Sequence, residues 1–69
     1  MYFLTKDKVI VEGREYTVYG MKYNDGPFAA DLSTDKHSVQ RLVEKCNEYK
    51  LEPIHMFDVI EDFLAEIKS

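Results

Sequence analysis

The chain has 69 residues, 45% of them apolar, and a formal net charge of −4. We expect one domain with a marginal core, because a chain of this size buries only about 60% of the surface that its unfolded form exposes. The apolar content excludes a disordered protein, and the one cysteine, Cys46, excludes an internal disulfide. No cysteine and histidine cluster has the spacing of a zinc site. The fold therefore needs good packing or self-association.

Hydropathy and charge also limit where the protein can be located and which classes of partner it can bind. No apolar run approaches the roughly 20 residues of a membrane span, and the start of the chain, "MYFLTKDK", lacks the features of a signal peptide. Together with the unpaired cysteine, this predicts a cytoplasmic protein with no membrane partner. Residues 51–69 hold five of the 13 acidic residues and one of the nine basic residues, so residues 1–50 hold eight of each. Because no cluster of Lys and Arg is present, we expect no nucleic-acid partner.

Residues 8–23, "KVIVEGREYTVYGMKY", contain a hairpin signal. Gly13-Arg14 separates two β-rich runs, and glycine at the first central position favours a type II′ turn. That turn places Glu12 opposite Glu15. Residues 2–5 either begin a long first strand or form a short separate one, and the sequence does not decide between these.

A second turn is predicted at Asp25-Gly26, followed by Pro27 at the start of an edge strand. It places Tyr23 opposite Phe28. Side-chain alternation then gives the sheet a core face and a second face. The predicted core face holds Ile10, Thr17, Tyr19, Met21, Tyr23, Phe28, Ala30 and Leu32. The second face holds Val9, Val11, Tyr16, Val18, Gly20, Lys22, Ala29 and Asp31.

A helix is predicted after the strands, with Ser33 or Thr34 as its N-cap and Asp35 in its first turn. An apolar stripe about 120° wide follows at helical spacing. Its members are Val39, Leu42, Val43, Cys46 and Tyr49. Cys46 lies near the middle of this stripe, so we expect a buried and inert thiol. The helix must end before Pro53.

Pro53 is well placed in the first turn of a second helix. Two apolar rows on this helix cover about 220° of its circumference, more than a surface helix needs. One row is Ile54, Phe57, Ile60, Leu64 and Ile67, and the other is Met56, Val59 and Phe63. Either the helix is wedged between the sheet and the first helix, or an exposed strip pairs with a second copy or another protein.

The polar side of the second helix carries His55, Asp58 and Asp62, which share one face because residues at i, i+3 and i+7 align. The simplest interpretation is a solvated face with a weak pair between His55 and Asp58. A contact surface for another protein is a second interpretation, since Glu61, Asp62 and Glu66 form a negative ridge. A metal or acid–base site is a third, but two or three ligands from one helix do not close a metal site.

Catalytic signatures are missing from the sequence. It contains no Gly-rich phosphate loop, no Gly-x-Ser-x-Gly elbow and no His-Glu-x-x-His motif. We therefore expect no enzyme activity, no cofactor and no resident metal.

Three segments, "YTVYGM", "DLSTD" and "VQRLVEKCNEYKLEPIHMFDVIEDFLAE", resemble a small family of uncharacterised proteins from Firmicutes, especially clostridia. The family pattern has a Tyr-Gly pair that ends a strand, an Asp-x-Ser-x-Asp that opens a helix, and a Leu-x-Pro-x-His that leads into a second helix. These correspond to Tyr19-Gly20 and to residues 31–35, 51–55 and 58–63. The resemblance implies a compact α+β domain from a bacterial cytoplasm, and no reaction.

We therefore expect residues 1–69 to form one α+β domain, an antiparallel meander of three or four strands followed by two helices on one face of the sheet. The expected function is a small bacterial protein-interaction or regulatory module, with self-association as a homodimer or another protein as its partner. The candidate interaction surface is His55, Phe57, Asp58, Glu61 and Asp62. The alternative is a metal-dependent or acid–base site formed by His55, Asp58 and Asp62 across a dimer interface.

Overall fold

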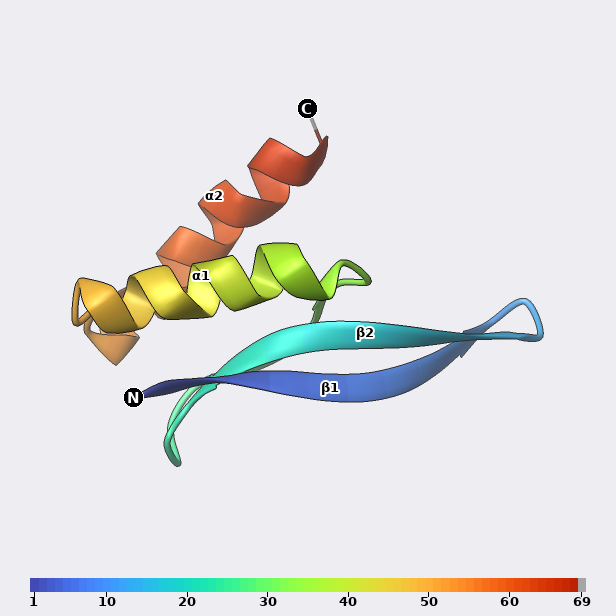
Figure 1. The fold of residues 1–69 in the computed structure, drawn as a ribbon, viewed down its shortest axis with the longest axis horizontal. Helices are drawn as coiled ribbons and strands as arrows, with labels where there is room; N and C mark the ends of the chain where they lie inside the picture. The colour runs from blue at the N-terminus through green and yellow to red at the C-terminus, as the bar shows by residue number, and fades with distance from the viewer. Residues whose placement is uncertain (69) are drawn as a thin grey trace.

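The computed structural model describes residues 1–68, and the side chains of residues 1–66. It contains β1 (Tyr2–Val11), β2 (Arg14–Tyr23), β3 (Phe28–Ser33), α1 (Lys36–Glu48), the 3-10 turn η1 (Pro53–His55) and α2 (Met56–Lys68). The three strands form one antiparallel sheet in the order β1-β2-β3. Figure 1 shows α1 lying along the β1–β2 hairpin and α2 running at an angle to it. The α+β class is confirmed, with three strands. Ile67, which we placed in an apolar row, lies outside the described side chains.

The first turn of the chain is one residue earlier than predicted. Glu12 and Gly13 both have positive φ angles, 52° and 78°, so they form the centre of the turn, and Val11 pairs with Arg14. Positive φ at both central residues is typical of a type I′ turn, whose twist matches that of the strands. The predicted Gly13-Arg14 type II′ turn is therefore wrong.

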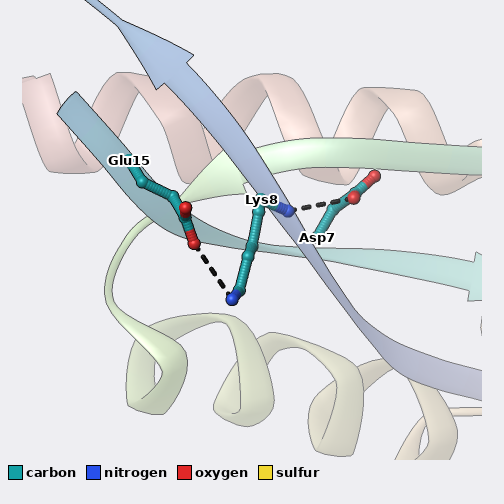
Figure 2. Close-up of polar contacts among 3 residues, drawn as sticks. All are labelled: Asp7, Lys8 and Glu15. Carbon is teal, nitrogen blue, oxygen red and sulfur yellow. Dashed lines mark hydrogen bonds and ion pairs between the residues drawn. The ribbon is translucent and has the colours of Figure 1, made fainter. Parts of the chain in front are cut away.

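Charge explains why the earlier turn is preferred. The predicted register places Glu12 directly opposite Glu15, which is unfavourable for like charges. In the structure Glu15 pairs with Ile10, and the Lys8 Nζ lies 2.9 Å from the Glu15 Oε1 (Figure 2). With the earlier turn, each residue of β1 pairs with a residue of β2 two positions away from its predicted partner. A shift of two keeps every side chain on the same face, so the two predicted faces of this hairpin are unchanged.

Residues 2–5 belong to the long first strand, which settles the question that the sequence left open. Tyr2 pairs with Tyr23, and Leu4 pairs with Met21. The amide N–H of Tyr2 donates to the Asn47 Oδ1 at 2.7 Å, and the Asn47 side-chain amide donates to the Tyr2 carbonyl at 3.0 Å. The start of β1 is therefore held by β2 on one side and by α1 through one asparagine.

The pairing of β2 with β3 differs from the prediction. Phe28 lies opposite Lys22, not Tyr23, and Met21 lies opposite Ala29. The register then shifts between Met21 and Tyr19. Because Phe28 pairs with Lys22, one residue away from the predicted partner, it lies on the second face of the sheet and is 52% exposed, so its predicted place in the core is wrong. The irregularity between Met21 and Tyr19 then breaks the alternation along β3. Ala29 packs against the core where Ala30 was predicted, whereas Leu32 is buried as predicted.

Gly20 lies at this irregularity. A Cβ atom added to it would lie 2.6 Å from the Ala30 carbonyl oxygen and even closer to the Ala29 carbonyl oxygen. Glycine therefore allows the β3 backbone to approach β2 closely. The Tyr19-Gly20 pair lies inside β2, so the expectation that it ends a strand is wrong.

The hydrophobic core lies between the predicted core face of the sheet and the helices. Its buried members are Tyr2, Met21, Leu32, Val39, Leu42, Val43, Cys46, Met56 and Ile60. Four of the five predicted stripe residues of α1 are among them, and the fifth, Tyr49, is 73% exposed because it is the C-cap residue and not part of the helix proper. Ile10 was predicted to join the core but is 75% exposed, because the hairpin extends beyond the N-terminal start of α1 (Figure 1).

Asp35 is the N-cap of α1, in place of the predicted Ser33 or Thr34. Its Oδ1 accepts a hydrogen bond from the His37 amide at 3.1 Å, and its Oδ2 accepts one from the Ser38 hydroxyl at 2.7 Å. The Ser33 hydroxyl oxygen in turn accepts from the Asp35 amide at 3.0 Å. The hydrogen bonds that the carboxylate accepts, the one from the Ser38 hydroxyl above all, lower the pKa of the Asp35 carboxyl below its ordinary value.

The end of α1 is closed by a Schellman-type pair of hydrogen bonds. The Leu51 amide donates to the Cys46 carbonyl at 3.0 Å, and the Lys50 amide donates to the Asn47 carbonyl at 3.2 Å. Lys50 has a φ of 51°, where glycine is usual. The helix therefore ends before Pro53, as predicted, and Pro53 opens η1, which leads into α2.

Candidate functional site

The polar side of α2 does not form a closed site in the described part of the chain. The His55 Nδ1 and the Asp58 Oδ2 are 3.8 Å apart, and both side chains are largely exposed. Asp62 lies further along and lines a groove between α1 and α2. Within residues 1–68, no group of three or more His, Cys, Asp or Glu side chains is arranged to hold a metal ion. The structure thus places His55 at the end of η1 and both aspartates on α2, and it does not gather the three side chains around a common point.

The groove between the helices has a volume of about 320 Å³. Leu42, Val59 and Phe63 form its apolar part, and its polar part combines Arg41 and Lys45 of α1 with acidic residues of α2. The groove is open to solvent and offers charged groups of both signs. It is therefore an amphipathic surface between two helices and not an enclosed pocket.

The wide apolar arc of α2 divides into a buried and an exposed part. Met56 and Ile60 are buried in the core, and Val59, Phe63 and Leu64 pack partly against it. Ile54, in the turn that precedes α2, is 80% exposed, and Phe57 is 54% exposed. One side of the arc thus packs inward, and the other leaves an isoleucine and a phenylalanine in solvent. That this exposed strip pairs with another chain stays a prediction.

Exposed acidic residues adjoin Phe57. Asp58, Glu61 and Asp62 are all exposed, and Asp58 lies in the first turn of α2, where the helix dipole favours a negative charge. Phe57 and Glu61 are one helical turn apart, so they lie on the same side of α2. We call His55, Phe57, Asp58, Glu61 and Asp62 the α2 contact surface.

A second exposed aromatic group was missed from the sequence. Phe3 pairs with Lys22, and Lys22 pairs with Phe28, so the three side chains form one row on the sheet face opposite the helices. Both phenylalanines are exposed. The row depends on the β2–β3 register, and no residue in the β2–β3 loop identifies that register from sequence. The predicted register placed Phe28 in the core and hid the row.

Another hollow, of about 370 Å³, lies where the start of β1 meets the end of α1. Two of its polar side chains have partners within the fold, because the Tyr2 hydroxyl donates to the Leu51 carbonyl at 2.8 Å and Asn47 binds the backbone of Tyr2. Burial raises the pKa of the Tyr2 hydroxyl. It also raises the pKa of the Cys46 thiol, whose predicted burial is confirmed. This hollow is a packing junction.

In residues 1–68, neither helix combines the length and the apolar character that crossing a membrane would require. Comparison with curated proteins and with solved structures gives no match. A protein-family model does match, over residues 1–66, and its description is "Family of unknown function (DUF6514)". The resemblance to a family of unknown function is thus confirmed, while its restriction to Firmicutes stays a prediction. Since the match spans nearly the whole chain, this protein belongs to that family of unknown function, DUF6514.

Proposed function

We propose that the chain is a small protein-interaction or regulatory module of a bacterial cytoplasm, without catalytic activity of its own, that binds through the α2 contact surface. The observation that carries the proposal is the exposed Phe57, which stands among acidic side chains on a helix whose opposite side is buried. A rigid helix gives such a side chain a fixed position, as a binding surface requires.

The chemistry of this surface favours a partner with an exposed apolar patch and basic residues beside it. Aromatic side chains that become buried against a partner contribute much of the free energy of binding at protein interfaces. Acidic residues around such an anchor raise the association rate with basic partners and select against acidic ones. Asp58 and Glu61 are exposed beside Phe57, whereas Asp62 lines the groove that Arg41 and Lys45 also line. Asp58 and Glu61 are therefore the carboxylates closest to the anchor.

The test uses two matched pairs of variants. Phe57→Ser removes the anchor, and Phe28→Ser is its control, because Phe28 is a phenylalanine of nearly equal exposure on the sheet face opposite the helices (52% against 54%). Glu61→Lys reverses a charge on α2, and Glu44→Lys reverses one on the exposed side of α1.

Affinity capture from a lysate of the source cells and sedimentation equilibrium report the partner and the oligomeric state. We expect Phe57→Ser and Glu61→Lys to lose the contact that the native chain makes, and both controls to keep it. If all four variants behaved like the native chain in both measurements, the α2 contact surface would be rejected.

A further inference from the structure

The β1–β2 hairpin is covered by helices over only part of its length. On the face that packs against the helices, Tyr2 is buried and Leu4 is partly buried, whereas Lys6, Lys8 and Ile10 are exposed. Figure 1 shows the reason, since the hairpin turn projects well beyond the N-terminal start of α1. We call residues 6–17 the far ribbon. Its inner face is continuous with the core face but has no layer above it.

An uncovered ribbon of this kind has little stability of its own. Two strands without a packing layer are marginally stable in water, and this ribbon exposes apolar side chains on both faces, Ile10 on one and Val11 and Tyr16 on the other. The ion pair between Lys8 and Glu15 is solvent-exposed and contributes little (Figure 2). The ribbon therefore gains stability from any partner that covers Ile10.

The charges of the inner face favour an acidic partner. Lys6 and Lys8 precede Ile10 along this face of β1, and Glu15 is engaged with Lys8 at 2.9 Å. Within the described residues, Lys6 makes no ion pair. The inner face of the far ribbon thus offers an exposed isoleucine and a net charge of about +1 from Lys6, although the ribbon as a whole is neutral. The α2 contact surface offers the complement, an exposed phenylalanine among carboxylates.

We infer that a second copy of this chain covers the far ribbon with its α2 contact surface, and that its own ribbon covers α2 of the first copy. This inference rests on the proposed function and names the partner. A two-fold axis makes the two contacts identical, so each complementary pair of surfaces is used twice. Both helices lie on one side of the hairpin, and the far ribbon extends past the N-terminal start of α1 (Figure 1). The α2 helix of the second copy then occupies the space that α1 leaves open above the ribbon.

The test combines one apolar variant with a pair of charge reversals. Sedimentation equilibrium measures the dimer dissociation constant of the native chain, of Ile10→Ser, of Lys6→Glu and of Glu61→Lys. We expect a dimer for the native chain and about a tenfold or larger weakening for each variant, because each acts at both symmetric contacts. Lys22→Glu, on the opposite face of the sheet, is the control and leaves the dissociation constant unchanged. Circular dichroism verifies that every variant folds.

The decisive step is to mix the Lys6→Glu chain with the Glu61→Lys chain. In a dimer of either variant alone, like charges face each other at both contacts. In the mixed pair, the ribbon of the first variant meets α2 of the second with the two charges exchanged, and the other contact keeps its native charges. Dimerisation is therefore restored only in the mixture. A native chain that stays monomeric, or a mixture that stays dissociated, overturns the inference.

Two outcomes separate this inference from the proposed function. If Phe57→Ser abolishes a native contact while Ile10→Ser leaves it intact, the α2 contact surface stands and the far ribbon is not its partner. If Ile10→Ser abolishes the dimer and Phe57→Ser does not, the ribbon binds elsewhere on the second copy and the inference is rejected, whereas the α2 contact surface is then judged by the capture experiment with Phe57→Ser and Glu61→Lys.

Discussion

The two ends of the β1–β2 hairpin have the same strand pairing but opposite surroundings. At the near end Tyr2 and Met21 are buried under the helices, and their face continues without interruption to Ile10 at the far end, which is in solvent. The alternation of side chains is the same at both ends. Periodicity therefore identifies which face a residue lies on, but not whether anything covers that face.

Element lengths account for the difference. α1 has 13 residues, which makes it about 20 Å long. β1 has 10 residues and is therefore roughly 33 Å long. A helix that packs along the near end must leave the far end bare, and α2 does not fill the gap because it diverges from the hairpin (Figure 1). Comparing the lengths of predicted elements would have indicated this overhang from the sequence.

The largest expected difference between the two ends is in core packing. Met21→Ala removes a fully buried side chain and should lower the free energy of unfolding by about 2–5 kcal/mol. Ile10→Ala removes an exposed one and should cost less than about 0.5 kcal/mol. Urea unfolding of both variants, at a concentration where the chain is monomeric, makes the comparison. Equal losses would show that the far end is covered within a single chain.

Two glycine substitutions compare the same two ends of the hairpin, with a smaller expected loss of stability. Gly20→Ala places a Cβ against the Ala29 and Ala30 carbonyl groups at the near end, so β3 must shift, at a cost of about 1–3 kcal/mol. Gly13→Ala meets no neighbour, but its φ of 78° strains an alanine by about 1 kcal/mol. Thermal unfolding distinguishes them. A larger loss for Gly13→Ala than for Gly20→Ala would contradict the close approach of β3 to Gly20.

The sequence predicted the fold class, the hairpins and both helices, because each follows from local patterns. Alternation assigned the side chains of the first hairpin to the correct faces even though the predicted turn was one residue too late. This is because the pairing shifted by two residues, which leaves each side chain on the same face. The predicted β2–β3 pairing failed first because Phe28 pairs with Lys22 and not with Tyr23, and again because of an irregularity at Gly20, where two backbones approach. Such a contact between β2 and β3 has no signature in residue type alone beyond the glycine itself.

The candidate surface was predicted less completely. The sequence identified α2, Phe57 and the acidic residues, because a helical wheel shows an apolar arc wider than packing needs. It did not show which part of the arc is buried, since that depends on the angle at which α2 leaves η1. It also missed the exposure of Ile10 and Phe28, which follow from element length and from sheet register.

Removal of a tyrosine hydroxyl group should give the next smaller difference in stability between the two ends. Tyr2→Phe removes the hydrogen bond to the Leu51 carbonyl at the near end and should lower the free energy of unfolding by about 1 kcal/mol. Tyr16→Phe changes an exposed side chain at the far end and should have no measurable effect. Chemical denaturation at neutral pH compares the two. A loss for Tyr16→Phe as large as that for Tyr2→Phe would contradict the assignment.

The same tyrosine predicts a dependence on alkaline pH. Burial raises the pKa of Tyr2 in the folded chain above its ordinary value of 10.0. The unfolded chain then releases this proton first, so the contribution of Tyr2 is complete below pH 10 and is lost as the pH rises through the folded pKa. The native chain should lose stability above pH 10 more steeply than Tyr2→Phe does. Parallel pH profiles for the two chains would show that Tyr2 is not buried.

The smallest effect tests the hairpin register itself. The Lys8 and Glu15 side chains are 2.9 Å apart and exposed, so a double-mutant cycle with Lys8→Ala and Glu15→Ala should give a coupling of about 0.2–1 kcal/mol. Salt at about 1 M should remove most of it, because it shortens the Debye length to roughly 3 Å. The alternative turn at Gly13-Arg14 places Glu15 opposite Glu12 and moves Lys8 away from it. Under that register Glu15→Ala would relieve a repulsion and stabilise the chain, so the sign of this one variant decides which turn the far end of the hairpin adopts.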